Sequence, residues 1–168
     1  MSENCLVEFS KEESCSVMQE QISQLIEKAF ANPFKKYRYC LHQKPECTLH
    51  EMIIVTTKYD LKYPDKHMYT TESNIILRGK LLMVLFNEVG DIQKSFVLDP
   101  EKTFYFRCEK NRYHMTLPLT DIAVYIEIKE GPFVDKSNIF PDWAPNRENR
   151  EDIITFNQMI KEKALKLV

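Results

Sequence analysis

The sequence has little glycine, no long apolar run and no excess of one charge. Only three of its 168 residues are glycine, and it contains no Gly-rich phosphate-binding motif. The longest apolar run, residues 81–86, is far shorter than the ~20 residues that span a bilayer. The 23 basic and 25 acidic residues give a net charge of -2, which provides no basic surface for a nucleic-acid backbone. We therefore expect a protein that binds neither nucleic acid nor a membrane.

The cysteines and the first residues both indicate the inside of a cell. Five cysteines are an odd number without the tight spacing of a disulfide framework, so reduced thiols are expected, and one disulfide remains compatible with the count. Residues 1–5 have neither the basic leader nor the apolar stretch of a secretory signal. A cytoplasmic location is the resulting expectation.

The apolar pattern predicts one mainly β domain with a helix at each end. Residues 14–31 and 151–167 carry apolar side chains at helical spacing, and Pro33 ends the first of these segments. Residues 36–130 consist of short runs rich in Ile, Val, Tyr, Phe and Thr between polar turns, as in a barrel or sandwich. Residues 131–150 contain three prolines and should cover the barrel. The strands expected are 37–42, 50–57, 61–67, 74–77, 80–87, 92–98, 103–108, 114–118 and 123–129.

Four ligand-type side chains predict a metal site. Asp65 and His67 are two residues apart at a strand end, so they share one face, and a turn can bring Glu72 beside them. His114 comes much later, and a barrel can fold its hairpin against the first. Mixed nitrogen and oxygen ligands suit one divalent ion such as Zn, Fe, Mn or Ni. The alternative is that Asp65, His67 and Glu72 are turn residues on a solvated rim.

Further segments place the metal motif in a larger ordered set. They are 38–42, 51–54, 84–90, 125–133 and 143–145, and with this set the sequence resembles the WbuC family of cupin-fold metalloproteins. His67, Glu72 and Gly79 match the first cupin motif, whereas Asp65 replaces its first histidine. The second motif has a glycine shortly before its histidine, and Asn111 is predicted to take that place because asparagine tolerates a positive φ.

The resemblance implies a fold and a set of functions. The fold is a single double-stranded β-helix, the cupin or jelly-roll barrel, and other cupins suggest a homodimer. WbuC-like proteins are associated with surface-polysaccharide (O-antigen) biosynthesis, which implies a small polar substrate such as a sugar or nucleotide sugar, isomerised or epimerised. Two alternatives remain open, a non-catalytic sugar-binding or regulatory protein and an Fe(II)-dependent dioxygenase. Whether the chain catalyses any reaction is left open.

Three further residues are candidates for a substrate pocket, namely Arg38, His42 and Glu127. An equally favoured interpretation of Arg38 is that it pairs with a nearby carboxylate. For Glu127, which alternates along a strand with apolar residues, a solvated face is the preferred interpretation. A separate group of cysteines and histidines suggests a zinc site by its residue types. Its spacing is not that of a common zinc finger, so buried thiols are the preferred interpretation. This group consists of Cys40, His42, Cys47 and His50.

Overall fold

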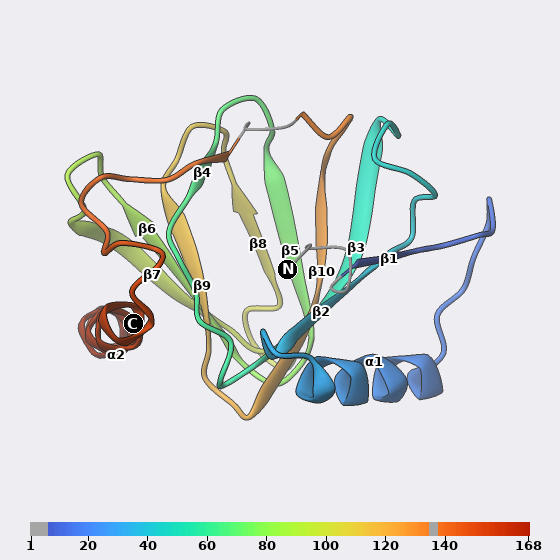
Figure 1. Cartoon of the computed structure of the whole chain (residues 1–168), viewed down its shortest axis with the longest axis horizontal. Coiled ribbons are helices and arrows are strands. Elements are labelled where there is room, and N and C mark those ends of the chain that lie inside the picture. Colours follow the sequence, from blue (N-terminus) through green and yellow to red (C-terminus); the bar gives the residue numbers. More distant parts are fainter. Residues whose placement is uncertain (1–6, 135–137) are drawn as a thin grey trace.

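The computed structural model describes residues 7–134 and 138–168, and these residues form β-sheets flanked by two helices (Figure 1). The large number of β-branched and aromatic residues in the middle of the chain accounts for the predominance of strands. In chain order the elements are β1 (Val7–Phe9), α1 (Gln19–Ala31), β2 (Lys36–Cys40), β3 (Leu49–Thr57), β4 (Lys66–His67), β5 (Glu72–Arg78), β6 (Leu81–Phe86), β7 (Ile92–Leu98), β8 (Tyr105–Cys108), β9 (His114–Pro118), β10 (Ile122–Glu130), β11 (Asn138–Ile139) and α2 (Arg150–Leu165).

Two sheets face each other across the main core. The larger has the order β1-β2-β3-β10-β5-β8, and the smaller has the order β7-β6-β9, while β4 and β11 form a separate pair. Met52 and Ile76 of the larger sheet pack in one cluster with Leu81 and Met83 of β6. The mainly β jelly-roll barrel with a helix near each end is therefore confirmed.

Each helix packs an apolar stripe on the outside of one sheet. Ile22, Leu25 and Ala29 of α1 lie against Ile53 and Val55 of β3. Helix α2 in the same way covers the outer face of the smaller sheet, so the two helices lie on opposite sides of the barrel (Figure 1). Because both faces of β3 and β6 are buried, these strands are nearly continuous apolar runs. Within the described residues, neither helix has the length and apolarity to cross a bilayer.

One predicted strand is largely wrong. Of residues 61–67, only Lys66–His67 form a strand, and its partner is β11, which the sequence did not predict. Pro64 lacks an N–H for a ladder hydrogen bond. The backbone N–H and C=O of Lys62 instead bond the side-chain amide of Asn157 in α2, at 2.9 and 2.7 Å. The segment is therefore tied to a helix rather than to a sheet.

Positive φ angles occur at the turns where the motifs need them. Gly79 has φ 74° between β5 and β6, and a Cβ there would lie 2.1 Å from the carbonyl oxygen of Ile122. Asn111 has φ 57°, which confirms the prediction that it takes the place of the glycine before His114. Its backbone N–H donates to the carbonyl oxygen of His67 at 2.7 Å. The turn before β9 is thus held against the end of β4.

Candidate metal centre

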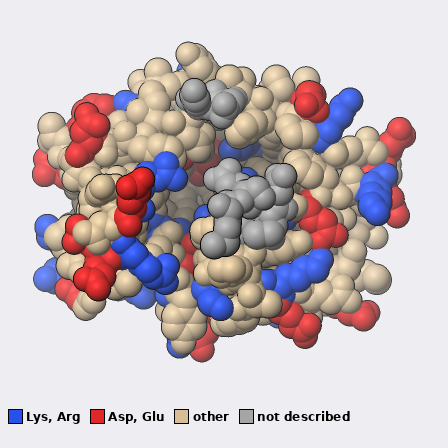
Figure 2. Space-filling view, in the orientation of Figure 1, with Lys and Arg blue, Asp and Glu red and all other residues tan. Residues whose placement is uncertain are grey.

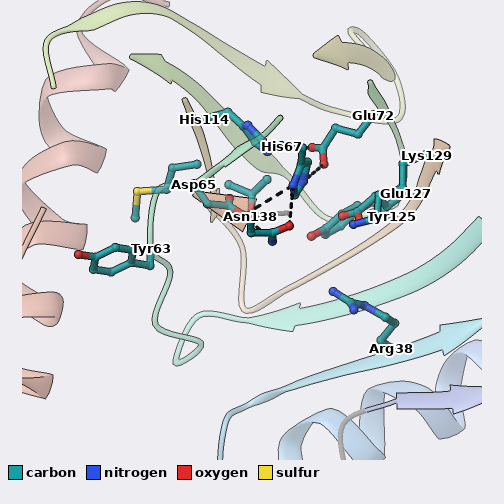
Figure 3. A pocket seen from close by; sticks show the side chains of 12 residues that line it. Arg38, Tyr63, Asp65, His67, Glu72, His114, Tyr125, Glu127, Lys129 and Asn138 are labelled. Atoms are coloured by element: carbon teal, nitrogen blue, oxygen red, sulfur yellow. Dashed lines mark hydrogen bonds and ion pairs between the residues drawn. The ribbon is translucent and has the colours of Figure 1, made fainter. Parts of the chain in front are cut away.

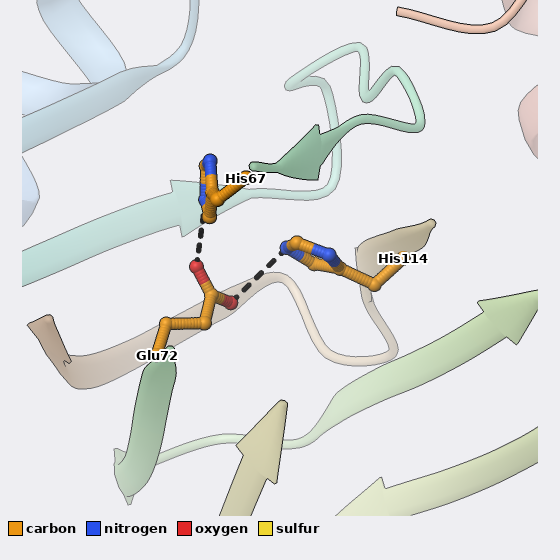
Figure 4. Close-up of side chains that lie close together, drawn as sticks. All are labelled: His67, Glu72 and His114. Atoms are coloured by element: carbon orange, nitrogen blue, oxygen red, sulfur yellow. Dashed lines mark hydrogen bonds and ion pairs between the residues drawn. The ribbon is translucent and has the colours of Figure 1, made fainter. Parts of the chain in front are cut away.

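Three side chains from three different sheets meet inside the barrel. His67 ends β4, Glu72 begins β5 and His114 begins β9, and all three are buried. The Oε2 atom of Glu72 lies 3.0 Å from Nε2 of His67, and its Oε1 atom lies 3.2 Å from Nε2 of His114 (Figure 4). One ligand atom from each residue lies within 4.8 Å of the other two. The sequence-predicted convergence of these three residues is therefore present.

Hydrogen bonds orient both imidazole rings. Nδ1 of His67 lies 3.0 Å from Oδ1 of Asn138, and Nδ1 of His114 lies 3.0 Å from the carbonyl oxygen of Arg112. Because each partner accepts, each Nδ1 carries the proton, and the Nε2 atoms are left for ligation. Two imidazole Nε2 atoms facing a carboxylate form the donor set that Zn, Fe, Mn or Ni accept. The described residues thus fit a divalent ion.

The electrostatics of the cluster favour positive charge. Burial opposes ionisation of Glu72, but the facing His114 and His67 outweigh it and hold the pKa of Glu72 well below its usual range. Burial also opposes protonation of His114, yet the Glu72 carboxylate outweighs it and raises the pKa of His114 well above its usual range. A positive charge beside this carboxylate, carried by a proton or by a metal ion, is therefore stabilised.

Asp65 lies outside the group of three. Its Oδ2 accepts a hydrogen bond from Nδ2 of Asn138 at 2.9 Å and is 3.9 Å from Nδ1 of His67, the ring nitrogen that points away from Glu72. Its backbone forms a bridge to His114 through two hydrogen bonds of 3.0 and 3.1 Å. In this arrangement Asp65 supports Asn138 and His67, and its role as a fourth ligand stays a prediction.

Two supporting amides were not found by sequence reasoning. Asn138 joins His67 to Asp65, and Asn74 donates from Nδ2 to Oε1 of Glu72 at 3.0 Å. Asn74 is fully buried, and its Oδ1 has no hydrogen-bond partner among the described residues. Asn74 lies two residues after Glu72 on the same strand face, a spacing that could have identified it. Asn138 is 71 residues from His67, and no local signal indicated it.

A polar cavity of about 140 Å³ opens beside the cluster (Figure 3). Arg38 and Glu127, two of the three predicted pocket residues, line it, and Arg38 points into it from β2. The third, His42, is not among its lining residues, and its ring stacks on that of His50 with centroids 4.2 Å apart. The lining residues are Arg38, Tyr63, Asp65, His67, Glu72, His114, Met115, Thr116, Tyr125, Glu127, Lys129 and Asn138.

The preferred interpretation of the Glu127 face as solvated is wrong. Tyr125, Glu127 and Lys129 all line the cavity, with exposed fractions of only 12% and 14% for the last two side chains. Strand β10 lies between β3 and β5 in the larger sheet, and Val124 on its other face packs towards α1. Because that apolar face is already covered, the polar face is turned into the barrel.

The second group of cysteines and histidines does not form a three-ligand cluster within the described residues, although His42 and His50 stack on each other. Among residues 7–134 and 138–168, the only group of three ligand residues close enough to share an ion is His67, Glu72 and His114. Nε2 of His50 lies 3.0 Å from the carbonyl oxygen of Pro45, and Cys40 is buried. The four described cysteines are free, and Cys5 lies outside the described residues. The preference for buried thiols over a zinc site agrees with this arrangement at Cys40.

A jelly-roll barrel that holds a His-Glu-His cluster beside a polar cavity defines a cupin-fold protein, and comparisons with known proteins support this fold. Residues 17–98 match the family model described as a domain of unknown function, DUF6016. No curated protein matches the chain.

Two solved structures illustrate the likeness. CapF, a capsular polysaccharide assembling protein from Staphylococcus aureus, is 14% identical with a TM-score of 0.53, over 62% of this chain and 31% of that chain. The DMSP lyase DddQ from Ruegeria pomeroyi DSS-3 is 14% identical with a TM-score of 0.51, over 66% of this chain and 54% of that chain. The chain thus spans about a third and about half of their lengths. At this identity the likeness shows the fold alone.

Proposed function

We propose that this protein binds one divalent metal ion through His67, Glu72 and His114 and acts with it on a small polar substrate of the sugar or nucleotide-sugar class. The observation that carries the proposal is the buried cluster itself, in which both Nδ1 atoms are engaged and both Nε2 atoms face one carboxylate. Asp65 remains in the proposed ligand set as the fourth residue. A cytoplasmic homodimer also remains a prediction.

The cavity suits the chemistry of hydroxyl and carbonyl groups. A bound divalent ion would polarise such a group as a Lewis acid. Glu127 is available to accept a proton from the substrate carbon next to this hydroxyl or carbonyl group. The Glu127 carboxylate lies 3.7 Å from Nζ of Lys129, which is available to stabilise the negative charge of that carboxylate. Arg38 offers donors to a substrate oxygen. Proton removal from one carbon begins both isomerisation and epimerisation: return of the proton to the same carbon from the other face gives an epimer, and return to the adjacent carbon gives an isomer.

The size of the cavity limits what can enter it. Its volume of about 140 Å³ is below the roughly 300–1,000 Å³ typical of sites for drug-sized ligands. A small sugar, or only the reacting end of a larger one, is therefore proposed to reach the ion. The resemblance to WbuC proteins and the fold shared with the capsular polysaccharide assembling protein CapF support the sugar class.

One observation favours a second candidate, a sugar-binding or regulatory protein without turnover. Asp65, which replaces the first histidine of the cupin motif, lies outside the group of three and bonds Asn138. A weaker set of ligands would hold an ion less firmly, and the same cavity would then bind a sugar without transforming it.

Metal content tests the proposal. We would purify the protein without chelators and measure metal by elemental analysis in the wild type, His67→Ala and His114→Ala, with His42→Ala as a matched control. The expected result is near-stoichiometric metal in the wild type and in His42→Ala, and its loss in the other two variants. Asp65→Ala tests the fourth ligand separately. A wild-type protein that takes up no Mn, Fe, Ni or Zn would contradict the metal site and leave the non-catalytic alternative.

Turnover is tested next, because metal content does not report it. Incubation of the metal-loaded protein with nucleotide sugars in D₂O, followed by NMR, detects deuterium incorporation at a carbon from which a proton is removed. The wild type should incorporate deuterium, and Glu127→Gln should not. Metal binding without any deuterium incorporation or product would favour the binding protein.

A further inference from the structure

A second, larger cavity adjoins the polar cavity that opens beside the metal cluster. Its volume is about 490 Å³, within the range typical of ligand sites. Among the described residues, four line both cavities, namely Tyr63, Asp65, Thr116 and Asn138. A ligand that reaches the metal cluster with one end can therefore extend into this space, which we call the outer cavity.

The outer cavity is basic, although the whole chain has a net charge of -2. Among the described residues, its lining includes Lys36, Lys62, Arg147 and Arg150, against the single carboxylate of Asp65. Lys62 is neutralised by Asp60, since their Nζ and Oδ2 atoms are 2.7 Å apart. The local excess of positive charge is therefore assigned to Arg147 and Arg150. On the face drawn in Figure 2, basic and acidic side chains are intermingled.

Arg147 is oriented by aromatic rings rather than by an acid. Its guanidinium carbon lies 3.9 Å from the ring centroid of Phe140 and 5.6 Å from that of Tyr63. Within residues 7–134 and 138–168, neither Arg147 nor Arg150 forms an ion pair. Stacking fixes the plane of a guanidinium and leaves its N–H groups available, and such a planar fork matches the oxygens of a phosphate.

Apolar side chains stand beside these cations. Phe34 and Phe140, which are 45% and 38% exposed, line the same cavity with Leu61 and Ile153. A fully hydrated inorganic ion would gain no binding free energy from these apolar side chains. The ring of an organic phosphate would bury apolar surface against them. The lining therefore favours a phosphate that carries an organic group.

We propose that the outer cavity binds the phosphate-bearing part of the substrate, held by Arg147 and Arg150, while its other end reaches the metal cluster. This inference rests on the proposed function and narrows the substrate class to a phosphorylated compound. A sugar phosphate and a nucleoside diphosphate linked to a sugar share this chemistry. The polar cavity beside the cluster receives only the reacting group of the substrate. The outer cavity supplies most of the binding free energy.

Calorimetric titration tests the outer cavity without the metal. The full-length protein in EDTA is titrated with UDP and with glucose 1-phosphate, because phosphates would otherwise bind the ion directly. We compare the wild type with Arg147→Gln, Arg150→Gln and Arg78→Gln. Arg78 is an exposed arginine on β5 that bonds Gln19, and its substitution removes the same charge far from the cavity lining.

The expected result is binding by the wild type that weakens about tenfold in Arg147→Gln and in Arg150→Gln and is unchanged in Arg78→Gln. Tighter binding of UDP assigns the cavity to a nucleoside diphosphate, and equal binding assigns it to the phosphate of a sugar. No binding of either probe, or an equal loss in Arg78→Gln, overturns the inference. Because metal is absent from these titrations, either outcome leaves the test of the metal site independent.

Discussion

At the scale of single residues, the candidate site depends on amides as much as on its ligand-type side chains. Asn74 and Asn138 each bond one residue of the cluster, Asn74 to the Glu72 carboxylate and Asn138 to the His67 ring. Such supporting hydrogen bonds keep a ligand atom aimed at the ion and raise its basicity. The three ligand-type residues therefore do not define the site alone.

Replacement of either amide should weaken metal binding without removing a ligand. We expect Asn74→Ala and Asn138→Ala each to raise the dissociation constant for the ion about 10- to 100-fold, because Glu72 or His67 loses its orienting partner. Competition with a chromophoric chelator measures this constant. Asn157→Ala is the matched control, since its amide also makes two hydrogen bonds but to the backbone of Lys62. Unchanged affinity in both test variants would contradict the supporting role.

The thiol of Cys40 should be inert in the folded protein. Burial raises its pKa to about 11, so at pH 8 only ~0.1% is the reactive thiolate. Peptide mapping after brief iodoacetamide treatment at pH 8 should find Cys15, which is exposed, modified and Cys40 unmodified. Unfolding in guanidinium chloride before labelling should make Cys40 react. Labelling of Cys40 at the rate of Cys15 in the native protein would contradict the effect of burial.

At the scale of elements, the turn before β9 determines where His114 lies. Asn111 holds φ 57° there and donates its N–H to the carbonyl oxygen of His67. Asn111→Ala should destabilise the protein by about 1–2 kcal/mol, because alanine resists this conformation, whereas Asn111→Gly should be nearly neutral. Chemical denaturation followed by circular dichroism measures both. Equal stability of the alanine and glycine variants would show that the backbone conformation is not the determining factor.

The elements also show how far the sequence alone predicts this structure. The helical and alternating periods identified both helices and most strands, since those elements bury an apolar face that leaves a local pattern. The short pair of β4 and β11 has no such pattern, because it joins His67 to Asn138 across 71 residues. The polar face of β10 was misassigned for a related reason, because alternation does not indicate which side of a strand is interior.

The candidate site was predictable to the same extent. The spacing of His67 and Glu72 across one turn indicated their convergence, and the order of motifs indicated His114. Asp65 was expected beside Glu72, but its carboxylate bonds Asn138, a partner from the covering segment that spacing could not reveal. Long-range partners of this kind require the assembled barrel.

At the scale of the whole molecule, the cluster joins all three sheets. His67 belongs to the two-stranded sheet, Glu72 to the six-stranded sheet and His114 to the three-stranded sheet. Unfolding separates these sheets and with them the three ligand atoms. An ion at this position would therefore bind the folded chain far better than the unfolded one, and its binding free energy would add to the stability of the fold.

Metal should consequently raise the melting temperature in a way that requires the cluster. An ion at 100 times its dissociation constant stabilises the folded state by about 2.7 kcal/mol, which corresponds to roughly 5–10 °C in a chain of this size. Differential scanning calorimetry of the chelator-treated protein with and without added Mn or Zn measures the shift. His42→Ala should keep it, while His67→Ala and His114→Ala should lose it whatever their own baseline stability. A shift of equal size in the two cluster variants would mean that the ion stabilises the protein from another position.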